Sequence, residues 1–515
     1  MIEERDTICA VSTPPGVGGI AVVRVSGPRA LAIADSVWRG KRLSDVTSHT
    51  VHFGTVFDPS AGCDLDQSVA TVFRAPSSFT GDDVVELSLH GSRYVQREAV
   101  NLLIRNGCRL AEPGEFTRRA FAAGKMDLAE AEAVADVIAS TSRASHRVAV
   151  SQMRGDLSRK LESLRSRLLD LASLLELELD FSEEDVEFAS REKLIAIAGE
   201  AVALTGALCD SYSTGQALRD GIPVVILGKT NAGKSTLLNR LTGHDRAIVS
   251  DIHGTTRDTI DDLIEISGIP FRIIDTAGLR LTDDPIESLG IERTLKAASR
   301  AKIILHLIDA TELSREDIVA AEEGVAGELA AIAPGFRMPE GARMIRLLNK
   351  VDLLEGNSCV GAVEGESNSC AVTVEGETAG VAMTPGLHDG QMEPQDCRRE
   401  NLDGNVKPLD DFIQVSARTG YGIERLKSAL VKASGMADAL EGDAIMLTNS
   451  RHYEALLHAT ASLNAVLSGL QTGLSGDFIA QDLREALLHI GSVTGSAITT
   501  PEILSTIFSR FCVGK

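Results

Sequence analysis

Short apolar segments separated by Pro and Gly fill the first 120 residues of the chain. Five of them have the length and composition of β-strands: ICAVSTP, GGIAVVRVSG, SHTVHFGTVF, QSVATVFRAP and DDVVELSLHG. The stretch SRYVQREAVNLLIRNG has helical character instead. This combination predicts a small α+β domain over residues 1–120.

From about residue 121 the apolar pattern becomes helical. Within SRKLESLRSRLLDLASLLELELD, leucines recur at spacings of 4, 3, 4, 3 and 4, which places them on one side of a helix. These are Leu157, Leu161, Leu164, Leu168, Leu171 and Leu175. We favour the core of a helical bundle, over residues 121–216, rather than a free-standing coiled coil.

A third pattern begins near residue 217, where the strand DGIPVVILG runs into a Gly-rich turn and the helix KSTLLNRLTG. Further apolar strands follow in FRIIDTAG, AKIILHLIDA, ARMIRLLNKVD and FIQVSAR, which is typical of a parallel sheet with crossover helices. Residues 437–515 are helical again. The α/β domain, 217–436, is therefore predicted to be inserted into one helical domain, with its own ends close together.

Residues 355–410 interrupt the α/β pattern. They contain eight Gly, no aromatic residue, and eleven acidic against three basic residues. Such a segment buries too little apolar area to offset the entropy of ordering, so we expect a mobile surface insertion.

Length, composition and charge limit the classes of protein to which the chain can belong. At 515 residues the chain is long enough for about three domains, and its apolar fraction is 43%. We find no apolar run of membrane-spanning length and no secretory signal, so we expect a cytoplasmic protein without a membrane partner. The net charge of −22 argues against nonspecific coating of nucleic acid, although a local RNA contact stays open. The eight cysteines form no C-x-x-C pair.

The segment Gly228–Ser235 fits the phosphate-binding pattern G-x-x-x-x-G-K-[ST] between a strand and a helix. Backbone N–H groups cradle phosphates, Lys234 reaches the outer ones and Ser235 can bind Mg²⁺. Asn349-Lys350-Val351-Asp352 adds a carboxylate for the paired N–H donors of guanine, and Ser416-Ala417-Arg418 a backbone contact to its ring. With Asp275-Thr276-Ala277-Gly278 between the first two, the four motifs, in order, predict a GTP-binding domain.

Two further segments lie on the γ-phosphate side. Thr256 can complete the Mg²⁺ shell, Asp275 can hold the metal through water, and Gly278 can donate its N–H to the γ-phosphate. The predicted GTP-binding residues are Asn231, Ala232, Gly233, Lys234, Ser235, Thr236, Ser250, Asp251, Ile252, His253, Gly254, Thr255, Thr256, Asp275, Thr276, Ala277, Gly278, Asn349, Lys350, Asp352, Ser416, Ala417 and Arg418.

Leu279 follows Gly278 and has no polar atom with which to orient an attacking water. The catalytic group must therefore come from elsewhere in the chain or from a partner. Glu287 is the best placed acid, with Asp283 and Asp284 as rivals on the residues alone.

The segments FTGDDVVELSLHG, EPGEFTRRAFAAGKMDLAEAEAVADVI, GKTNAGKSTLLNRL, GTTRD, DTAGLR and FCVGK closely resemble the MnmE (TrmE) family of tRNA-uridine-modifying GTPases. The resemblance covers the chain except 355–410. It implies an N-terminal folate-binding domain that forms a homodimer, a helical domain and an inserted Ras-like G domain. It also implies an FAD-containing partner, MnmG, which joins it in a heterotetramer or larger complex. Together they add aminomethyl or carboxymethylaminomethyl groups to C5 of the tRNA wobble uridine.

The same resemblance assigns further site residues. Contacts to a tetrahydrofolate derivative, in its 5,10-methylene or 5-formyl form, fall on Arg24, Glu86, Lys125 and Lys515. A K⁺ ion that assists hydrolysis when two G domains meet would be held by Asn231 and by carbonyls of Ser250, Ile252 and Thr255. The water-positioning residue falls on Glu287.

Two questions stay open on the sequence. Cys512 lies in the Cys-Val-Gly-Lys tail; we favour a structural or site-lining role over a catalytic thiol, because no neighbouring base is visible to lower its pKa. The second reading of the whole chain is an Era- or Der-like GTPase of ribosome assembly, which would share every G-domain motif. Such a protein would carry a basic RNA-binding module outside the G domain.

Overall fold

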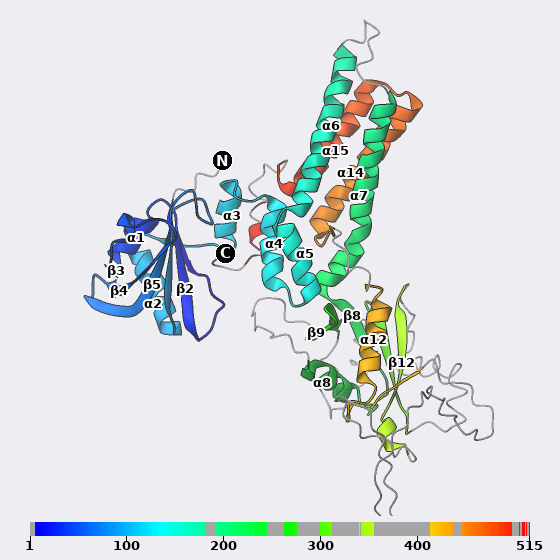
Figure 1. Ribbon diagram of the computed structural model, residues 1–515, viewed down its shortest axis with the longest axis horizontal. Coiled ribbons are helices and arrows are strands. Elements are labelled where there is room, and N and C mark those ends of the chain that lie inside the picture. Colours follow the sequence, from blue (N-terminus) through cyan, green and yellow to red (C-terminus); the bar gives the residue numbers. More distant parts are fainter. Residues whose placement is uncertain are drawn as a thin grey trace, which may run out of the picture.

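The structure is a computed structural model of the 515-residue chain. It describes residues 6–180, 191–229, 231–244, 262–274, 299–311, 341–354, 412–436 and 445–496, with residues 339, 504, 507–509, 511 and 514. A β-rich part near the N-terminus, a bundle of long helices and a second sheet form three regions (Figure 1). The expected multidomain α+β and α/β fold is confirmed.

The N-terminal region is a seven-stranded sheet of order β3-β4-β5-β6-β2-β1-β7. The five predicted strands are present, joined by helices α1 (Ala30–Ser36) and α2 (Arg93–Arg105). The strands are β1 (Ile8–Val11), β2 (Gly18–Ser26), β3 (Trp38–Gly40), β4 (Thr50–Asp58), β5 (Cys63–Phe73), β6 (Val84–Gly91) and β7 (Arg109–Leu110).

Alternation along the strands decides which face each side chain occupies. Val23 and Val25 of β2 are buried in the core that α1 and α2 cover. Arg24, between them, therefore lies on the opposite face of the sheet. Ser92 caps α2 by accepting a hydrogen bond from the backbone N–H of Tyr94, which explains where the predicted helix begins.

The helical region is built from two stretches of sequence. The first contributes α3 (Glu115–Ala122), α4 (Leu128–Ala139), α5 (Arg143–Met153), α6 (Asp156–Asp180) and α7 (Arg191–Asp220). The second contributes α14 (Ser450–Thr472) and α15 (Gly476–Thr494). All six predicted leucines of α6 are buried in one core with residues of α7, α14 and α15, so the bundle interpretation is confirmed.

A buried ion cluster joins α4 to α14. Arg451 donates two hydrogen bonds to the Glu132 carboxylate, at 3.0 and 2.8 Å, and His452 Nε2 lies 2.7 Å from Glu132 Oε2. Burial alone would raise the pKa of Glu132, but the bonds from His452 and Arg451 outweigh it and lower the pKa to about 2. The cluster links the two sequence stretches of the bundle.

The second sheet has the order β13-β12-β11-β8-β10-β9. Its strands are β8 (Ile222–Leu227), β9 (Asp262–Ile266), β10 (Ile269–Ile273), β11 (Ile303–Asp309), β12 (Arg343–Asn349) and β13 (Phe412–Gln414). All pairs are parallel except β9 with β10. Helices α8 (Lys234–His244) and α12 (Ile423–Ser434) contribute to its core, as the alternating pattern predicted.

The chain leaves the bundle for this sheet and returns to it at one place. Leu447 N donates to Ser211 Oγ at 3.1 Å, and a Cβ added to Gly215 would lie 2.1 Å from the Leu447 carbonyl oxygen. Gln152 Nε2 also donates to the Met446 carbonyl at 2.8 Å. The segments that flank the predicted inserted domain on its two sides therefore lie in contact.

Helix α7 bears on the expectation that the chain has no membrane-spanning segment. Within the described residues, α7 is long and apolar enough to cross a membrane by length and composition, although no continuous apolar run is visible in its sequence. Its Leu194, Ala198 and Leu208 are buried in the bundle core, and Tyr212 stacks on Tyr453 of α14 with ring centroids 4.4 Å apart. These contacts make α7 a bundle helix.

The insertion 355–410 lies outside the described residues.

Candidate functional site

The phosphate-binding turn lies between the end of β8 and the start of α8. Lys234, the first residue of α8, donates from Nζ to the carbonyls of Gly228 and Lys229, both at 2.7 Å. Burial lowers the pKa of Lys234. The turn therefore places the ammonium group beside the N-terminus of α8, where backbone N–H groups and the helix dipole favour an anion.

Two residues of the turn have left-handed backbone conformations. Asn231 has φ 65° and is exposed, whereas Gly233 has φ 97°. A Cβ at Gly233 would lie 2.3 Å from Asn349 Nδ2, so the glycine is required both by its φ and by the close approach of Asn349. The second glycine of the phosphate-binding motif is therefore needed because the Asn349 side chain, from the Asn-Lys-x-Asp motif, packs directly against it.

Asn349 connects three of the predicted segments. It is 2% exposed at the end of β12; its Nδ2 donates to the Ala232 carbonyl at 2.8 Å, and its Oδ1 accepts from the Ala417 N–H at 3.0 Å. The phosphate-binding turn and the turn after β13 are thus held at fixed positions by one side chain. Asn349 thus contacts one motif that lies 117 residues before it in the sequence and another that lies 68 residues after it.

Lys350 and Asp352 follow Asn349 in the sequence. Lys350 has φ 65°, and its Nζ lies 2.5 Å from Asp309 Oδ2 at the end of β11. Asp352 lies in the short 3₁₀ helix Val351–Leu353, where it is partly exposed. The carboxylate predicted to recognise guanine therefore follows the carboxyl end of β12, three residues after Asn349, whose side chain contacts the phosphate-binding turn.

Sequence reasoning missed Asp309. Burial would raise its pKa, but hydrogen bonds from Lys350 and Thr311 outweigh burial and hold the pKa below its ordinary value. Asp309 is paired in register with Asn349 across β11 and β12. The sequence did contain a signal for Asp309. It is an acid at the end of the buried strand IILHLID, and that strand neighbours the one that carries the Asn-Lys-x-Asp motif.

The turn after β13 is shaped by its own hydrogen bonds. Ser416 is fully buried; its N–H donates to the Tyr421 carbonyl, and its Oγ accepts from the Thr419 N–H at 3.1 Å. Arg240 of α8 donates to the Thr419 carbonyl at 2.6 Å. Ala417 is buried and Arg418 exposed, so the turn offers backbone and an exposed cation at the rim of the site.

The described residues include only part of the predicted site. Ser235 and Asn231 make no hydrogen bond through their side chains with the described part of the chain, which leaves their oxygens open to a cation. The remaining predicted residues lie outside the described residues: Ser250, Asp251, Ile252, His253, Gly254, Thr255, Thr256, Asp275, Thr276, Ala277, Gly278, Glu287, Cys512 and Lys515, with Leu279 and the rival acids Asp283 and Asp284.

A second predicted site lies on the N-terminal sheet. Arg24 and Glu86 are paired across β2 and β6, and Arg24 Nε donates to Glu86 Oε1 at 2.8 Å. The Arg24 guanidinium carbon lies 5.4 Å from the ring centroid of Phe79 and 5.5 Å from that of Phe116 on α3. The arrangement combines a cation, a carboxylate and aromatic faces, a set that suits a flat, polar ring with an anionic tail.

The structure also locates Lys125 and the residue before Lys515. Lys125 is exposed just beyond α3, and a Cβ added to Gly81 would lie 3.8 Å from Lys125 Cε. Near the C-terminus, the Gly514 carbonyl accepts a hydrogen bond of 3.1 Å from Ser12 Oγ, directly after β1, the strand that pairs with β2. The residue before Lys515 therefore lies against the N-terminal sheet.

Comparison with known sequences gives consistent matches along the chain. The family model described as the GTP-binding protein TrmE N-terminus matches residues 7–125, and that of the MnmE helical domain matches residues 128–512. A tRNA modification GTPase MnmE from Parabacteroides distasonis is 44% identical over 99% of this chain and 100% of its own length. Proteins of the same name from Bacteroides thetaiotaomicron and Porphyromonas gingivalis are 42% and 44% identical over 99% of this chain, covering 100% and 98% of their own lengths.

Among solved structures, Era from Aquifex aeolicus bound to GDP and AlF₄⁻ aligns with 46% of this chain and 65% of its own. The sequence identity is 23% and the TM-score 0.23, which is too low to add to the argument.

Proposed function

The chain belongs to the MnmE (TrmE) family, and on that premise we propose that it is a GTPase that serves the modification of tRNA. The observation that carries the nucleotide part is Asn349, whose two hydrogen bonds join the phosphate-binding turn to the turn after β13. Lys234 at the start of α8 and Asp352 beyond β12 then face the two ends of one nucleotide. The protein would act in the cytoplasm, without a membrane partner.

The reaction we propose is the addition of an aminomethyl or carboxymethylaminomethyl group to C5 of the wobble uridine. An FAD-containing protein like MnmG would be the partner, in a heterotetramer or larger complex. Support comes from family membership alone. The flavin would supply redox chemistry, whereas this chain would supply GTP hydrolysis and a one-carbon donor.

The one-carbon donor would be a tetrahydrofolate derivative bound at the N-terminal sheet by Arg24, Glu86, Lys125 and Lys515. The Arg24–Glu86 pair and the aromatic rings beside it support this assignment, because a carboxylate can accept hydrogen bonds from the amide-like edge of a pterin. Lys125 and Lys515 would attract the glutamate tail.

The division of the chain into domain segments 1–120, 121–216, 217–436 and 437–515 remains our prediction.

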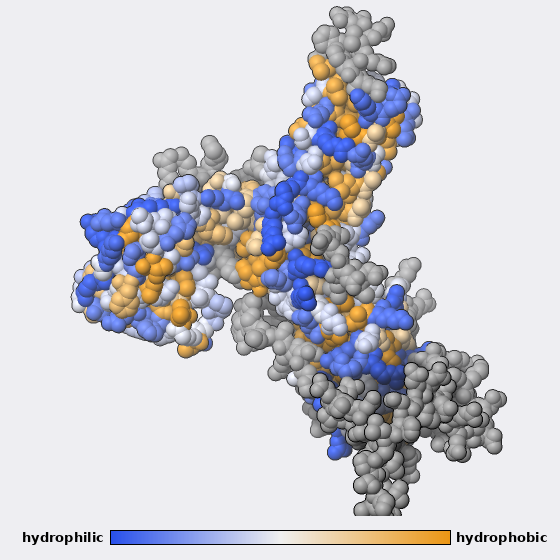
Figure 2. Space-filling model, in the orientation of Figure 1, coloured by the Kyte–Doolittle hydropathy of each residue, from blue (hydrophilic) through white to orange (hydrophobic). Residues whose placement is uncertain are grey.

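We further propose a homodimer formed through the N-terminal region. Its sheet exposes large apolar side chains, and Figure 2 shows apolar surface (orange) on this part of the molecule. The exposed fractions are 77% for Val17, 70% for Ile20, 63% for Val51 and 71% for Phe53. Exposed apolar side chains of this size favour association with another surface.

For hydrolysis, Ser235 and Thr256 would hold Mg²⁺, and Asn231 with the carbonyls of Ser250, Ile252 and Thr255 would hold K⁺. The open hydroxyl of Ser235 and the exposed amide of Asn231 fit hard cations, which prefer oxygen ligands. The ions would offset charge on the phosphates. Glu287 would orient the attacking water, because Leu279 cannot.

The test of the whole function is nucleoside analysis of tRNA from cells that lack the gene. We expect the wobble uridine to lose its C5 group, restored by the wild-type gene but not by Lys234→Ala. Unchanged wobble uridines together with a ribosome assembly defect would support an Era- or Der-like role instead. That alternative is not favoured, because the family matches extend across the regions outside the G domain.

The proposed hydrolytic machinery predicts a dependence on the monovalent cation. GTP turnover should be about 100-fold or more faster in KCl than in NaCl, the scale of one lost charge-stabilising contact. Glu287→Ala should remove most turnover while leaving GTP affinity within about 2-fold, as measured with a fluorescent nucleotide. Equal rates in both salts would exclude the K⁺ assignment, and normal turnover by Glu287→Ala would exclude its role, with Asp283→Ala as the matched control.

A further inference from the structure

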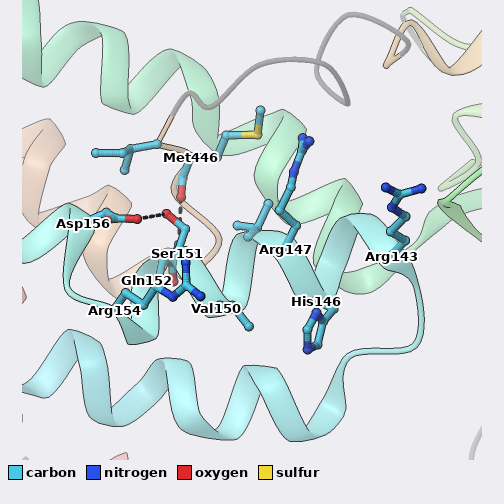
Figure 3. Close-up of a pocket in the computed structure, with 11 residues that line it drawn as sticks. Arg143, His146, Arg147, Val150, Ser151, Gln152, Arg154, Asp156 and Met446 are labelled. Carbon is cyan, nitrogen blue, oxygen red and sulfur yellow. Dashed lines mark hydrogen bonds between the residues drawn. The ribbon is translucent and has the colours of Figure 1, made fainter.

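A pocket of about 570 Å³ lies on α5, outside the nucleotide site and the Arg24 site. Its walls are side chains of α5, the following turn and the segment Ile445–Met446, where the chain returns from the second sheet. Gln152 fixes that wall through its hydrogen bond to the Met446 carbonyl. Figure 3 shows Arg143 and Arg147 extending from the same side of α5, with Met446 beside Arg147.

Three arginines, Arg143, Arg147 and Arg154, and one acid, Asp156, line the pocket, in a chain with a net charge of −22. Residues 143–160 contain five basic residues and one acid: Arg143, Arg147, Arg154, Arg159 and Lys160 against Asp156. All five basic residues are exposed. Asp156 is engaged by Ser151 Oγ at 2.6 Å and by Arg159, so it does not neutralise the arginines that line the pocket.

Two of the pocket arginines have no bonding partner among the described residues. Within the described residues, the guanidinium groups of Arg143 and Arg154 make no hydrogen bond and no ion pair. An exposed guanidinium group without an acidic partner keeps its hydrogen-bond donors available for an anionic ligand. The planar fork of each arginine matches a phosphate oxygen pair.

The spacing of the cations indicates the shape of the ligand. Arg143 and Arg147 are one helical turn apart, and Arg143 and Arg154 are separated by roughly 16 Å along the chain at 1.5 Å per helical residue. Groups spread over that length cannot converge on one phosphate ion. A row of phosphates on a polynucleotide backbone fits them, because it presents charges at regular intervals.

The surface is poorly suited to a protein partner. Stable protein interfaces bury apolar or aromatic groups at their centre. On α5, Met153 is the exposed large apolar residue, at 39% exposure, and the neighbouring exposed side chains are cationic or polar. Phosphate contacts need no such apolar centre.

We propose that the α5 pocket binds the sugar-phosphate backbone of tRNA, with Arg143 and Arg154 as phosphate contacts. The inference rests on the proposed role in tRNA modification and deepens it by naming where this chain holds the RNA. Contacts of this kind position the nucleic acid without reading its sequence. They would hold tRNA next to the two connections between the bundle and the G domain.

The test measures binding of an unmodified tRNA transcript to the full-length chain by fluorescence anisotropy across a range of KCl concentrations. For the double variant Arg143→Gln/Arg154→Gln we expect at least about 10-fold weaker binding at low salt, and a slope of log affinity against log salt shallower by about 1 to 2. Arg167→Gln/Arg484→Gln is the matched control, because it removes two exposed arginine charges from α6 and α15 of the same bundle. It should change neither quantity.

Wild-type affinity and slope in the double variant would overturn the proposal, as would a wild-type chain whose tRNA binding does not depend on salt. A double variant that keeps tRNA binding but loses binding to the purified flavoprotein partner would also overturn it, in favour of a protein-docking surface. Unchanged GTP turnover in the double variant verifies that it is folded. Failure of this inference leaves the nucleoside test untouched, since that test compares cells with and without the whole gene.

Discussion

At the scale of single residues, Asn349 determines the geometry of the nucleotide site. The sequence motif predicted that this residue belongs to the guanine side of the pocket. It could not predict that the amide would bond the phosphate-binding turn with one atom and the turn after β13 with the other, since these contacts depend on tertiary packing. Asp309 was missed for the same reason: its partner Lys350 comes from a neighbouring strand, 41 residues away.

The bonding of Asn349 leads to a prediction for Asn349→Asp. The new carboxylate oxygen would face the Ala232 carbonyl, so a donated hydrogen bond becomes a repulsion inside a buried site. We expect GDP affinity to fall by about 5- to 150-fold, corresponding to a loss of about 1–3 kcal/mol for an unsatisfied buried group. Equilibrium titration with a fluorescent GDP measures it. Asn239→Asp, an exposed change on α8, is the control; equal affinities for the two variants would contradict the bridging role.

At the scale of elements, repeating patterns in the sequence identified most of the described strands and the helices α2, α6 and α8, whereas residues 121–216 and 437–515 were predicted to be helical without individual helices. The leucine spacing of α6 and the apolar strand β8 are examples, because helical and extended periods differ along the chain. Pairing between elements was harder to predict. Nothing in the sequence linked Glu132 of α4 with Arg451 and His452 of α14, since a charge cluster formed across 319 residues has no local pattern.

The Glu132 cluster predicts how stability depends on pH. The folded-state pKa of about 2 lies below the ordinary 4.5, so the stabilisation is fully present above pH 4.5 and is lost as the pH falls through 2. Glu132→Gln should lower the free energy of unfolding by about 3 kcal/mol at neutral pH, at 1.36 kcal/mol per pKa unit, with the difference shrinking below pH 4.5.

Urea unfolding of wild type and variant at a series of pH values measures this difference. Glu200→Gln is the control, since its pair with Arg167 is solvent-exposed and should contribute less than about 1 kcal/mol. A difference for Glu132→Gln that is constant from pH 3 to pH 7 would contradict the assigned pKa.

At the scale of the whole molecule, the order of patterns along the chain predicted an α/β domain inserted into a helical one. The switch from helical to alternating patterns and back carries that information. The contact of the C-terminal tail with the N-terminal sheet could not be predicted from such patterns, because Ser12 and Gly514 are 502 residues apart. Only the family resemblance connected the two chain ends, through Lys515.

The tail contact predicts that the last residues serve the site on the N-terminal sheet. Deletion of residues 512–515 should weaken binding of 5-formyl-tetrahydrofolate by at least about 10-fold and leave GDP affinity unchanged, since charged hydrogen bonds contribute about 1.5–3 kcal/mol. Calorimetric titration of both ligands measures this. Ser12→Ala, which removes only the bond to Gly514, should have a smaller effect of about 2- to 10-fold. Full folate affinity after the deletion would refute the role of the tail.

In the described part of the chain, the bundle segments before and after the inserted sheet meet at Gly215 and Leu447, so the nucleotide-binding unit can be removed or exchanged as one block. Because the severed ends of the bundle already touch, a short artificial bridge would close the gap without stretching either flank. A GTP-binding domain can be inserted into a helical bundle at such a place during evolution. A protein engineer could replace that domain with another one at the same place.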